Sequence, residues 1–252
     1  ASGLRPCGNR SSRCDVQYLG AKKTIAAELA AVLETLRPTA DALFADLFCG
    51  SAAVAAAMRG PRILNDACPA LINMYNAYQA GTWRPPAELA EVDYKAIRAA
   101  MNVEDPLTAF AAFGCSYSGK WFGGYARDKN PETRRNFAAT AGRSLKKIMD
   151  RLEGATFTCH DYRLWSLKVF GTNCPPPGIL IYCDPPYKGT TTYGGMAPFD
   201  TDAFWAFVRM WRAMGCTVVV SEYEAPADWR EVWTRPVRKS RFAGVRVERM
   251  FV

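Results

Sequence analysis

A hydrophobic run that ends in an acid, two prolines and a tyrosine is the first feature that could do chemistry. The run 179–183 leads into Asp184-Pro185-Pro186-Tyr187, and 175–178 bounds it with prolines and a glycine. A short run of this kind is typical of a buried strand. Neither proline can donate to a sheet ladder, and each restricts the residue before it, so a stiff turn follows. The pattern predicts Asp184 at the carboxyl end of a central strand, where open α/β sheets bind ligands; an ordinary strand-ending turn is the alternative.

Two more acids follow predicted strands nearer the N-terminus. Asp46 lies in the apolar run 42–48, which a Cys-Gly-Ser turn at 49–51 joins to a helix expected over 52–58. Asp66 ends a second short strand, 66 − 46 = 20 residues later. A small-residue turn lets the backbone approach a ligand, and an acid at this spacing can accept both hydroxyls of a ribose. Asp66 could also cap the next helix, since Pro69 stands at a helix start.

Alternating strands and helices must position these side chains, which predicts an α/β fold with a Rossmann-like sheet. The predicted strands are 42–48, 62–66, 156–159, 179–183 and 216–223, with an edge strand in 242–252, and the predicted helices are 24–36, 52–58, 69–80 and 201–214. Helical periodicity in 87–101, 106–113 and 131–152 interrupts this alternation. We therefore expect one domain from 16–80 and 155–252, a helical insert at 81–154, and an irregular arm at 1–15.

Charge favours a polyanionic partner. The 252 residues carry a net charge of +8, with a pI near 9.1. Segment 116–151 has nine Lys and Arg against three Asp and Glu, a net 9 − 3 = +6. Aromatic residues at 121, 122 and 125 are interleaved with this charge, which suits phosphate contacts and base stacking or wedging. A solvated basic helix is the alternative.

Several classes of protein are disfavoured by composition. The nine cysteines include no Cys-x-x-Cys pair, and there is one histidine, so we expect neither a metal site nor a disulfide framework. No apolar run approaches the roughly 18 residues of a membrane span, and the start of the chain lacks a signal-peptide core. We expect a soluble cytoplasmic protein without a membrane partner.

Taken together, the motifs resemble those of Dam-like (D12 class) DNA adenine-N6 methyltransferases. Segment 16–23 resembles motif X, 46–53 resembles the cofactor motif I, and Asp66 falls at motif II. His160-Asp161-Tyr162 matches an acidic-aromatic pair after the third strand, and Asp184–Tyr187 matches motif IV. Segments 119–127 and 221–226 are similar to the compact phage and prophage branch, so the cell would be a bacterium or a phage-infected host. The resemblance spans about 16–252; Ala52 departs from it by standing where the family often has glycine.

The resemblance implies S-adenosylmethionine as cofactor. Tyr18 and Lys22 would hold its methionyl end, although a solvated lysine at a helix start is the alternative for Lys22. Other residues would bind the amino-acid, ribose and adenine parts of the cofactor, and Asp184 would face the same site. The residues implied, in that order, are Asp46, Phe48, Gly50 and Ser51, then Asp66, then Asp161 and Tyr162.

The resemblance also implies direct methyl transfer to the N6 amine of an adenine flipped out of DNA. Asp184 and the carbonyl of Pro185 would accept the two N–H bonds, Pro186 would stiffen the turn, and Tyr187 would stack on the base. Positioning and electrostatics would carry the catalysis. The DNA contacts expected from the insert and the turn after motif IV are Lys120, Trp121, Tyr125, Arg127, Arg134 and Lys188.

Other readings stay open at this stage. The methyl acceptor could be cytosine N4 or an adenine in RNA. A catalytically vestigial DNA-binding protein is a rival of a different class. We expect a monomer or a weak dimer, and the sequence does not specify which DNA site is recognised.

Overall fold

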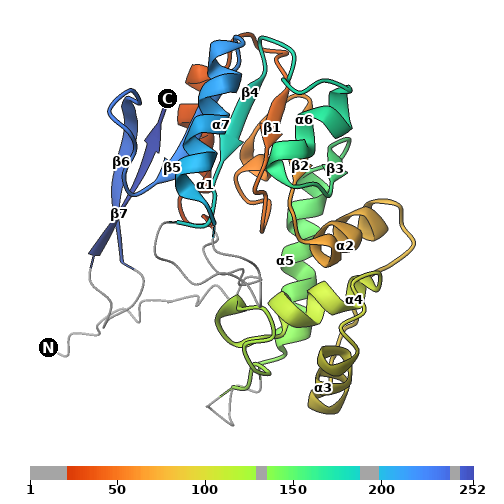
Figure 1. Ribbon diagram of the computed structural model, residues 1–252. Coiled ribbons are helices and arrows are strands. Elements are labelled where there is room, and N and C mark those ends of the chain that lie inside the picture. The colour runs from red at the N-terminus through yellow and green to blue at the C-terminus, as the bar shows by residue number, and fades with distance from the viewer. Residues whose placement is uncertain (1–21, 129–134, 188–198, 239–244) are drawn as a thin grey trace, which may run out of the picture.

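The computed structural model describes residues 22–128, 135–187, 199–238 and 245–252. Within them a seven-stranded sheet has the order β3-β2-β1-β4-β5-β7-β6 (Figure 1). Its first five strands are parallel, and β7 runs antiparallel to both neighbours. This mixed α/β sheet confirms the predicted Rossmann-like fold. The strands are β1 (Phe44–Asp46), β2 (Arg62–Asn65), β3 (Thr156–Thr158), β4 (Leu180–Cys183), β5 (Thr217–Glu222), β6 (Glu231–Arg238) and β7 (Val245–Phe251).

Helices cover both faces of the sheet. α1 (Ala26–Leu36) and α2 (Pro69–Gln79) pack with one face, and α6 (Tyr162–Phe170) and α7 (Thr201–Ala213) pack with the other (Figure 1). Because successive strand residues point to opposite faces, β4 contributes Leu180 and Tyr182 to the first core and Ile181 and Cys183 to the second. β4 is therefore buried on both sides, as its uninterrupted apolar sequence predicts.

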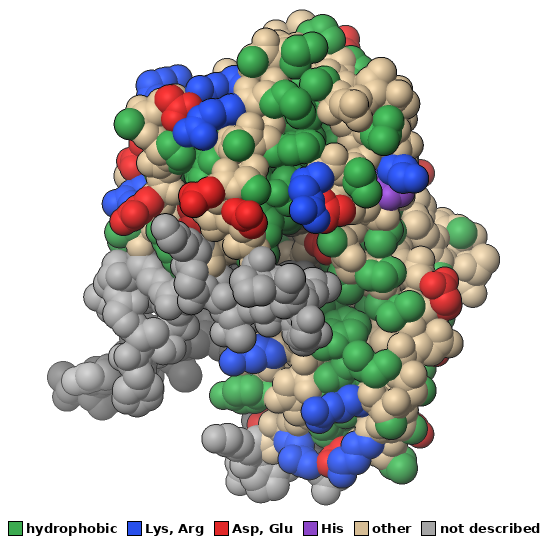
Figure 2. Space-filling view, in the orientation of Figure 1, with side chains coloured by type: hydrophobic (Ala, Val, Ile, Leu, Met, Phe, Trp, Pro, Cys, Tyr) green, Lys and Arg blue, Asp and Glu red, His purple; other side chains and the backbone are tan. Residues whose placement is uncertain are grey.

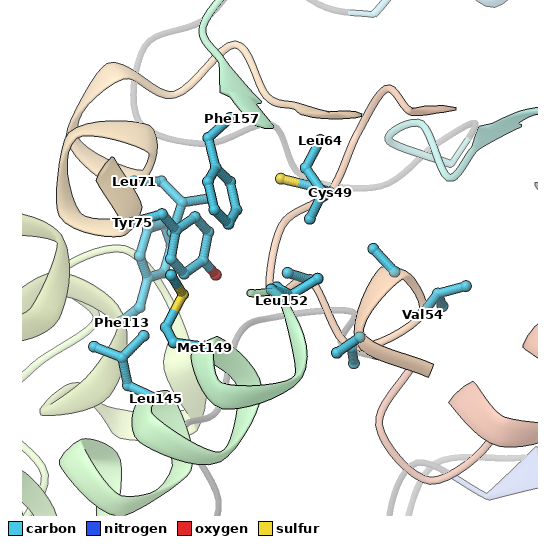
Figure 3. Packing of buried hydrophobic residues seen from close by; sticks show 14 of the residues in the cluster. Cys49, Val54, Leu64, Leu71, Tyr75, Phe113, Leu145, Met149, Leu152 and Phe157 are labelled. Carbon is cyan, nitrogen blue, oxygen red and sulfur yellow. The ribbon is translucent and has the colours of Figure 1, made fainter. Parts of the chain in front are cut away.

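The segment between α2 and β3 is mainly helical. It holds α3 (Glu91–Ala100), α4 (Pro106–Ala109), the π-helical turn η2 (Phe110–Gly114), the short turn η3 (Tyr117–Gly119) and α5 (Phe137–Arg151). Phe113, Leu145 and Met149 from this segment share a core cluster with Tyr75 and Phe157, as Figure 3 shows. This contact anchors the helical segment to the sheet through an apolar interface, which fixes the segment relative to the sheet.

Two local predictions were wrong, and α6 and β6 were not anticipated from the sequence. Segment 52–58 forms only the 3₁₀ turn η1 (Ala55–Ala57). Gly50 (φ 44°) and Ala52 (φ 56°) adopt left-handed backbone, which prevents a regular α-helix from starting there. The C-terminal strand β7 is not at the edge, since it lies between β5 and β6. β6 is the edge strand and tolerates Pro236, whose missing N–H costs least there. No helix in the described ranges is long and apolar enough to cross a membrane.

Candidate active site at the carboxyl edge of the sheet

Asp46 and Asp184 lie on neighbouring strands. β1 and β4 pair in parallel with Asp46 opposite Tyr182, and Asp184 is the first residue after β4. The chain leaves β1 toward β2 on one side and returns to β4 on the other, so these acids stand at the switch point of the sheet. The prediction that Asp184 stands at the carboxyl end of a central strand is confirmed.

The Asp46 carboxylate is buried without full compensation. Asp46 is 2% exposed, and its Oδ1 has no hydrogen-bond partner among the described residues. Burial raises the pKa of Asp46 well above its ordinary value, and the nearby charge of Asp184 raises it further. A buried carboxylate in this state would be stabilised by a cationic ligand group.

Asp66 fixes the loop that follows β1. Its Oδ2 accepts from the Gly50 backbone N–H at 3.0 Å, and its Oδ1 accepts from the Cys68 N–H at 2.9 Å. The Tyr75 hydroxyl donates to the Gly50 carbonyl at 2.7 Å from the other side. Burial raises the pKa of Asp66, while the two N–H donors lower it. Asp66 therefore holds the glycine turn and the residue before α2. It is not the N-cap of α2, which is Cys68, and among the described residues no side chain caps this helix. Each carboxylate oxygen of Asp66 retains a second lone pair.

Asn65, which sequence reasoning missed, ties three loops together. Its amide nitrogen donates to the Leu47 carbonyl at 3.3 Å and to the His160 carbonyl at 2.8 Å. Its amide oxygen accepts from the Thr158 hydroxyl at 3.0 Å and the His160 N–H at 3.1 Å. Asn65 is buried, so the loops after β1, β2 and β3 are joined by one satisfied amide. A polar residue directly after the apolar pair Ile63-Leu64, at the end of the strand, was the available signal.

Lys22 meets the Asp-Pro-Pro-Tyr turn. The Lys22 Nζ lies 3.0 Å from Asp184 Oδ1 and 3.2 Å from Glu248 Oε2, and it donates to the Tyr187 hydroxyl at 2.6 Å. Lys22 is 9% exposed, which excludes a solvated lysine. Burial lowers the pKa of Lys22, but Asp184 and Glu248 outweigh it, so the net shift is upward. Its ammonium therefore lies on the Asp184 side of the site, and its predicted contact with the cofactor stays a prediction.

The pKa of the Asp184 carboxyl depends on these same neighbours. Burial raises its pKa, and the Lys22 ammonium opposes this rise. Tyr187 sits edge-on to Tyr223, with ring centroids 4.5 Å apart. Glu248 on β7 completes this group and is a second residue that the sequence did not single out.

Asp161 and Tyr162 open α6. Asp161 is its N-cap, accepts from the Arg163 N–H at 2.9 Å, and binds the Arg163 guanidinium through both oxygens at 2.8 and 2.7 Å. This side-chain bonding lowers the pKa of Asp161. The Tyr162 ring packs with Phe48, at a centroid distance of 5.6 Å, and with Phe199, Phe204 and Phe207. The loops after β1 and β3 thus meet through aromatic rings.

The predicted DNA contacts fall into three groups. Lys120 is exposed, and Arg127 is exposed but holds Glu91 through a bidentate ion pair at 2.6 and 3.0 Å. Trp121 packs on Phe113, and the Tyr125 hydroxyl donates to the Leu89 carbonyl at 2.6 Å, so both also support the insert. Figure 2 shows several Lys and Arg side chains over the lower end of this face, where the insert lies. Tyr18, Arg134 and Lys188 lie outside the described residues.

Two aromatic residues of this loop differ from expectation. Phe122, expected to stack or wedge, is 5% exposed, with its ring against Tyr94, so it belongs to the core. Tyr117, which sequence reasoning passed over, is 65% exposed beside Ser118, whose φ is +57°. Tyr117 is thus the aromatic side chain that the loop presents to solvent. No group of His, Cys, Asp and Glu within the described ranges could hold a metal ion.

Comparison with known proteins gives one family. Residues 18–104 match the family model of D12 class N6 adenine-specific DNA methyltransferases. No curated protein matches the chain. Among solved structures, it is similar to the rRNA methyltransferase AviRa from Streptomyces viridochromogenes, with 14% identity, 89% of this chain and 83% of that chain covered, and a TM-score of 0.38. The matched part of the chain contains Lys22, Asp46 and Asp66, and the match supports a DNA adenine-N6 methyltransferase.

Proposed function

We propose that the protein uses S-adenosylmethionine to methylate the N6 amine of an adenine that is flipped out of DNA. One observation carries the proposal: Asp46, a buried acid with one unpartnered oxygen among the described residues, stands beside the Asp-Pro-Pro-Tyr turn at the switch point of the sheet. The buried acid suits a cationic cofactor, and the Asp-Pro-Pro-Tyr turn suits an amine substrate. Their adjacency brings methyl donor and acceptor together.

The residues at the carboxyl ends of β1, β2 and β3 fit the cofactor. S-adenosylmethionine carries an ammonium and a sulfonium, and it supplies an electrophilic methyl group. Asp46 and the backbone of Phe48, Gly50 and Ser51 would hold the amino acid. Asp66, already aligned by two N–H donors, would accept the ribose hydroxyls. Asp161 and Tyr162 would meet the adenine, with Asp161 sharing its oxygens between the ligand and Arg163.

The turn after β4 would activate the amine. The lone pair of adenine N6 is delocalised into the ring, so the nitrogen is a poor nucleophile. Asp184 and the Pro185 carbonyl would accept its two N–H bonds and favour a tetrahedral nitrogen, while Pro186 stiffens the turn and Tyr187 stacks on the base. S-adenosylmethionine would supply the methyl group: N6 would form the new N–C bond as the S–C bond breaks, the sulfur would keep that electron pair, and N6 would lose one proton to solvent. Orientation and electrostatics supply the rate.

DNA would bind across the insert, which we take as 81–154, with the catalytic part formed by 16–80 and 155–252. Lys120 and Arg127 would contact phosphates, with Arg134 and Lys188 as further candidates from the sequence. Trp121 and Tyr125 would shape the loop, and the exposed Tyr117 is the aromatic residue best placed to stack on DNA. Opening the duplex to release the adenine costs a few kcal/mol, which such contacts offset.

The direct test is to express the protein in a host that lacks DNA methylation and to sequence the DNA with base-modification readout. We expect N6-methyladenine in a defined sequence context. Methylcytosine, or methylation of RNA alone, would contradict the proposed acceptor. Calorimetry with S-adenosylmethionine addresses the cofactor, since absent binding would favour a vestigial enzyme.

Asp184→Ala tests the site itself. We expect this variant to bind DNA normally and to lose nearly all methyl transfer, because the amine loses its charged acceptor. Asp202→Ala, an exposed acid on α7, is the matched control and should retain full activity. Full activity in Asp184→Ala would refute the assigned chemistry.

A further inference from the structure

Glu248 is a buried acid on the last strand that contacts the catalytic turn. It is 5% exposed and shares the buried face of β7 with Met250. Its Oε2 accepts from the Tyr187 hydroxyl at 2.8 Å and lies 3.2 Å from the Lys22 Nζ. A buried carboxylate is stable only with such partners, and both partners belong to the site of the proposed reaction.

The position of Glu248 affects the charge that Asp184 presents. Lys22 lies between the two acids, 3.0 Å from Asp184 and 3.2 Å from Glu248. With Lys22 and Asp184 alone, the two opposite charges would cancel. With Glu248 present, the group carries a net charge of −1. Methyl transfer from a sulfonium to a neutral amine places positive charge on N6 until its proton leaves, and a net negative site stabilises that charge.

We propose that Glu248 is a positioning residue for methyl transfer: it shares the Lys22 ammonium with Asp184 and fixes the Tyr187 hydroxyl, so that the group of Lys22, Asp184 and Glu248 keeps a net negative charge beside the amine. This inference rests on the proposed function. Glu248 reaches the amine only through Asp184 and Tyr187. Its effect therefore falls on the transfer step, while cofactor binding at Asp46 and Asp66 is left unchanged.

Glu248→Gln is the central variant, because glutamine keeps the shape and one acceptor oxygen while it removes the charge. We expect kcat to fall by roughly tenfold to a hundredfold, the effect of a misplaced catalytic group. The KM for S-adenosylmethionine should stay within a factor of about two, since Glu248 contacts none of Asp46, Gly50 and Asp66. Glu248→Asp keeps the charge and should recover part of kcat.

The pH profile separates positioning from simple support of the fold. The Glu248 charge raises the pKa of Asp184, so Glu248→Gln should move the acid limb of kcat to lower pH. Lys22→Gln should move this limb to higher pH, because the ammonium lowers that pKa. The other titratable groups that interact with Asp184 in the described residues are unchanged in both variants: Asp46, Tyr182, Cys183 and Tyr187.

Glu231→Gln is the matched control, since Glu231 lies on the neighbouring strand and pairs with Arg249 at 3.1 Å. We expect it to leave kcat and the acid limb unchanged. A Glu248→Gln enzyme with wild-type kcat and an unshifted acid limb would overturn the inference. Equal losses in kcat and cofactor affinity would also overturn it, because they indicate a structural role. A wild-type protein without methyl transfer would instead refute the proposed function.

Discussion

At the scale of single residues, Asp46 lowers the stability of the folded protein in a way that suits ligand binding. Its carboxylate is buried next to Asp184 and has an oxygen without a partner in the described part of the chain. Such a group destabilises the folded protein in its charged form. The same feature suits a cationic ligand, so the site is arranged for a bound state.

We predict that Asp46→Asn raises the free energy of unfolding by roughly 1–3 kcal/mol at neutral pH. The folded-state pKa of Asp46 lies above its ordinary 3.8, so the penalty is full above the folded-state pKa and is relieved as pH falls toward 3.8. The gain from the mutation should therefore shrink in acid. Urea unfolding at several pH values measures this.

The same variant should bind S-adenosylmethionine at least about tenfold more weakly, because it loses a charge-assisted contact. Asp41→Asn, an exposed acid just before β1, is the control and should change neither quantity. Cofactor affinity unchanged in Asp46→Asn would remove Asp46 from the binding site.

At the scale of elements, the loops that follow β1, β2 and β3 act as one unit. Asn65 joins them through bonds to Leu47, Thr158 and His160. Asp66 then fixes Gly50. The proposed cofactor contacts thus come from separate loops, but their mutual position depends on two adjacent side chains.

We predict that Asn65→Ala lowers the free energy of unfolding by roughly 1–3 kcal/mol for each backbone group left unsatisfied, and weakens cofactor binding. Denaturant unfolding and calorimetry measure the two effects. Asn73→Ala removes a bond to the Val103 carbonyl at 3.0 Å and serves as control. It should lose some stability and keep cofactor affinity, so equal affinity losses in both variants would contradict the specific role of Asn65.

The turn at Ser118 gives a second prediction at this scale. Ser118 is exposed and has a φ of +57°, a conformation that glycine adopts without the cost of a side chain. We expect Ser118→Gly to raise stability by about 1 kcal/mol. Ser118→Ala tests the cause, because alanine keeps the strain and should not stabilise. A calorimetric melt that ranks the two variants equally would contradict the argument.

At the scale of the whole molecule, the net charge of +8 favours DNA. Lys120 is exposed, whereas Arg127 is already paired with Glu91. We therefore expect removal of the Lys120 charge to weaken DNA binding more than removal of the Arg127 charge.

We predict that Lys120→Ala weakens DNA binding and reduces the slope of log affinity against log salt by about 1. Arg127→Ala should reduce the slope less, because Glu91 offsets its charge. Lys168→Ala, exposed in the last turn of α6, is the control and should keep the wild-type slope. Binding measured over a range of salt concentrations decides this, and an unchanged slope for Lys120→Ala would exclude the contact.

The sequence by itself determined the parallel α/β core and the place of Asp184 in it. Apolar runs and prolines act within about ten residues, so the strand, the turn and the position of Asp184 could be predicted locally. The tertiary structure alone decided which distant groups meet. Lys22 reaches Tyr187 across 165 positions, and Tyr187 reaches Glu248 across 61. Those contacts depend on β7 entering the sheet beside β5, and strand order is set by the packing of the whole chain and not by any local pattern.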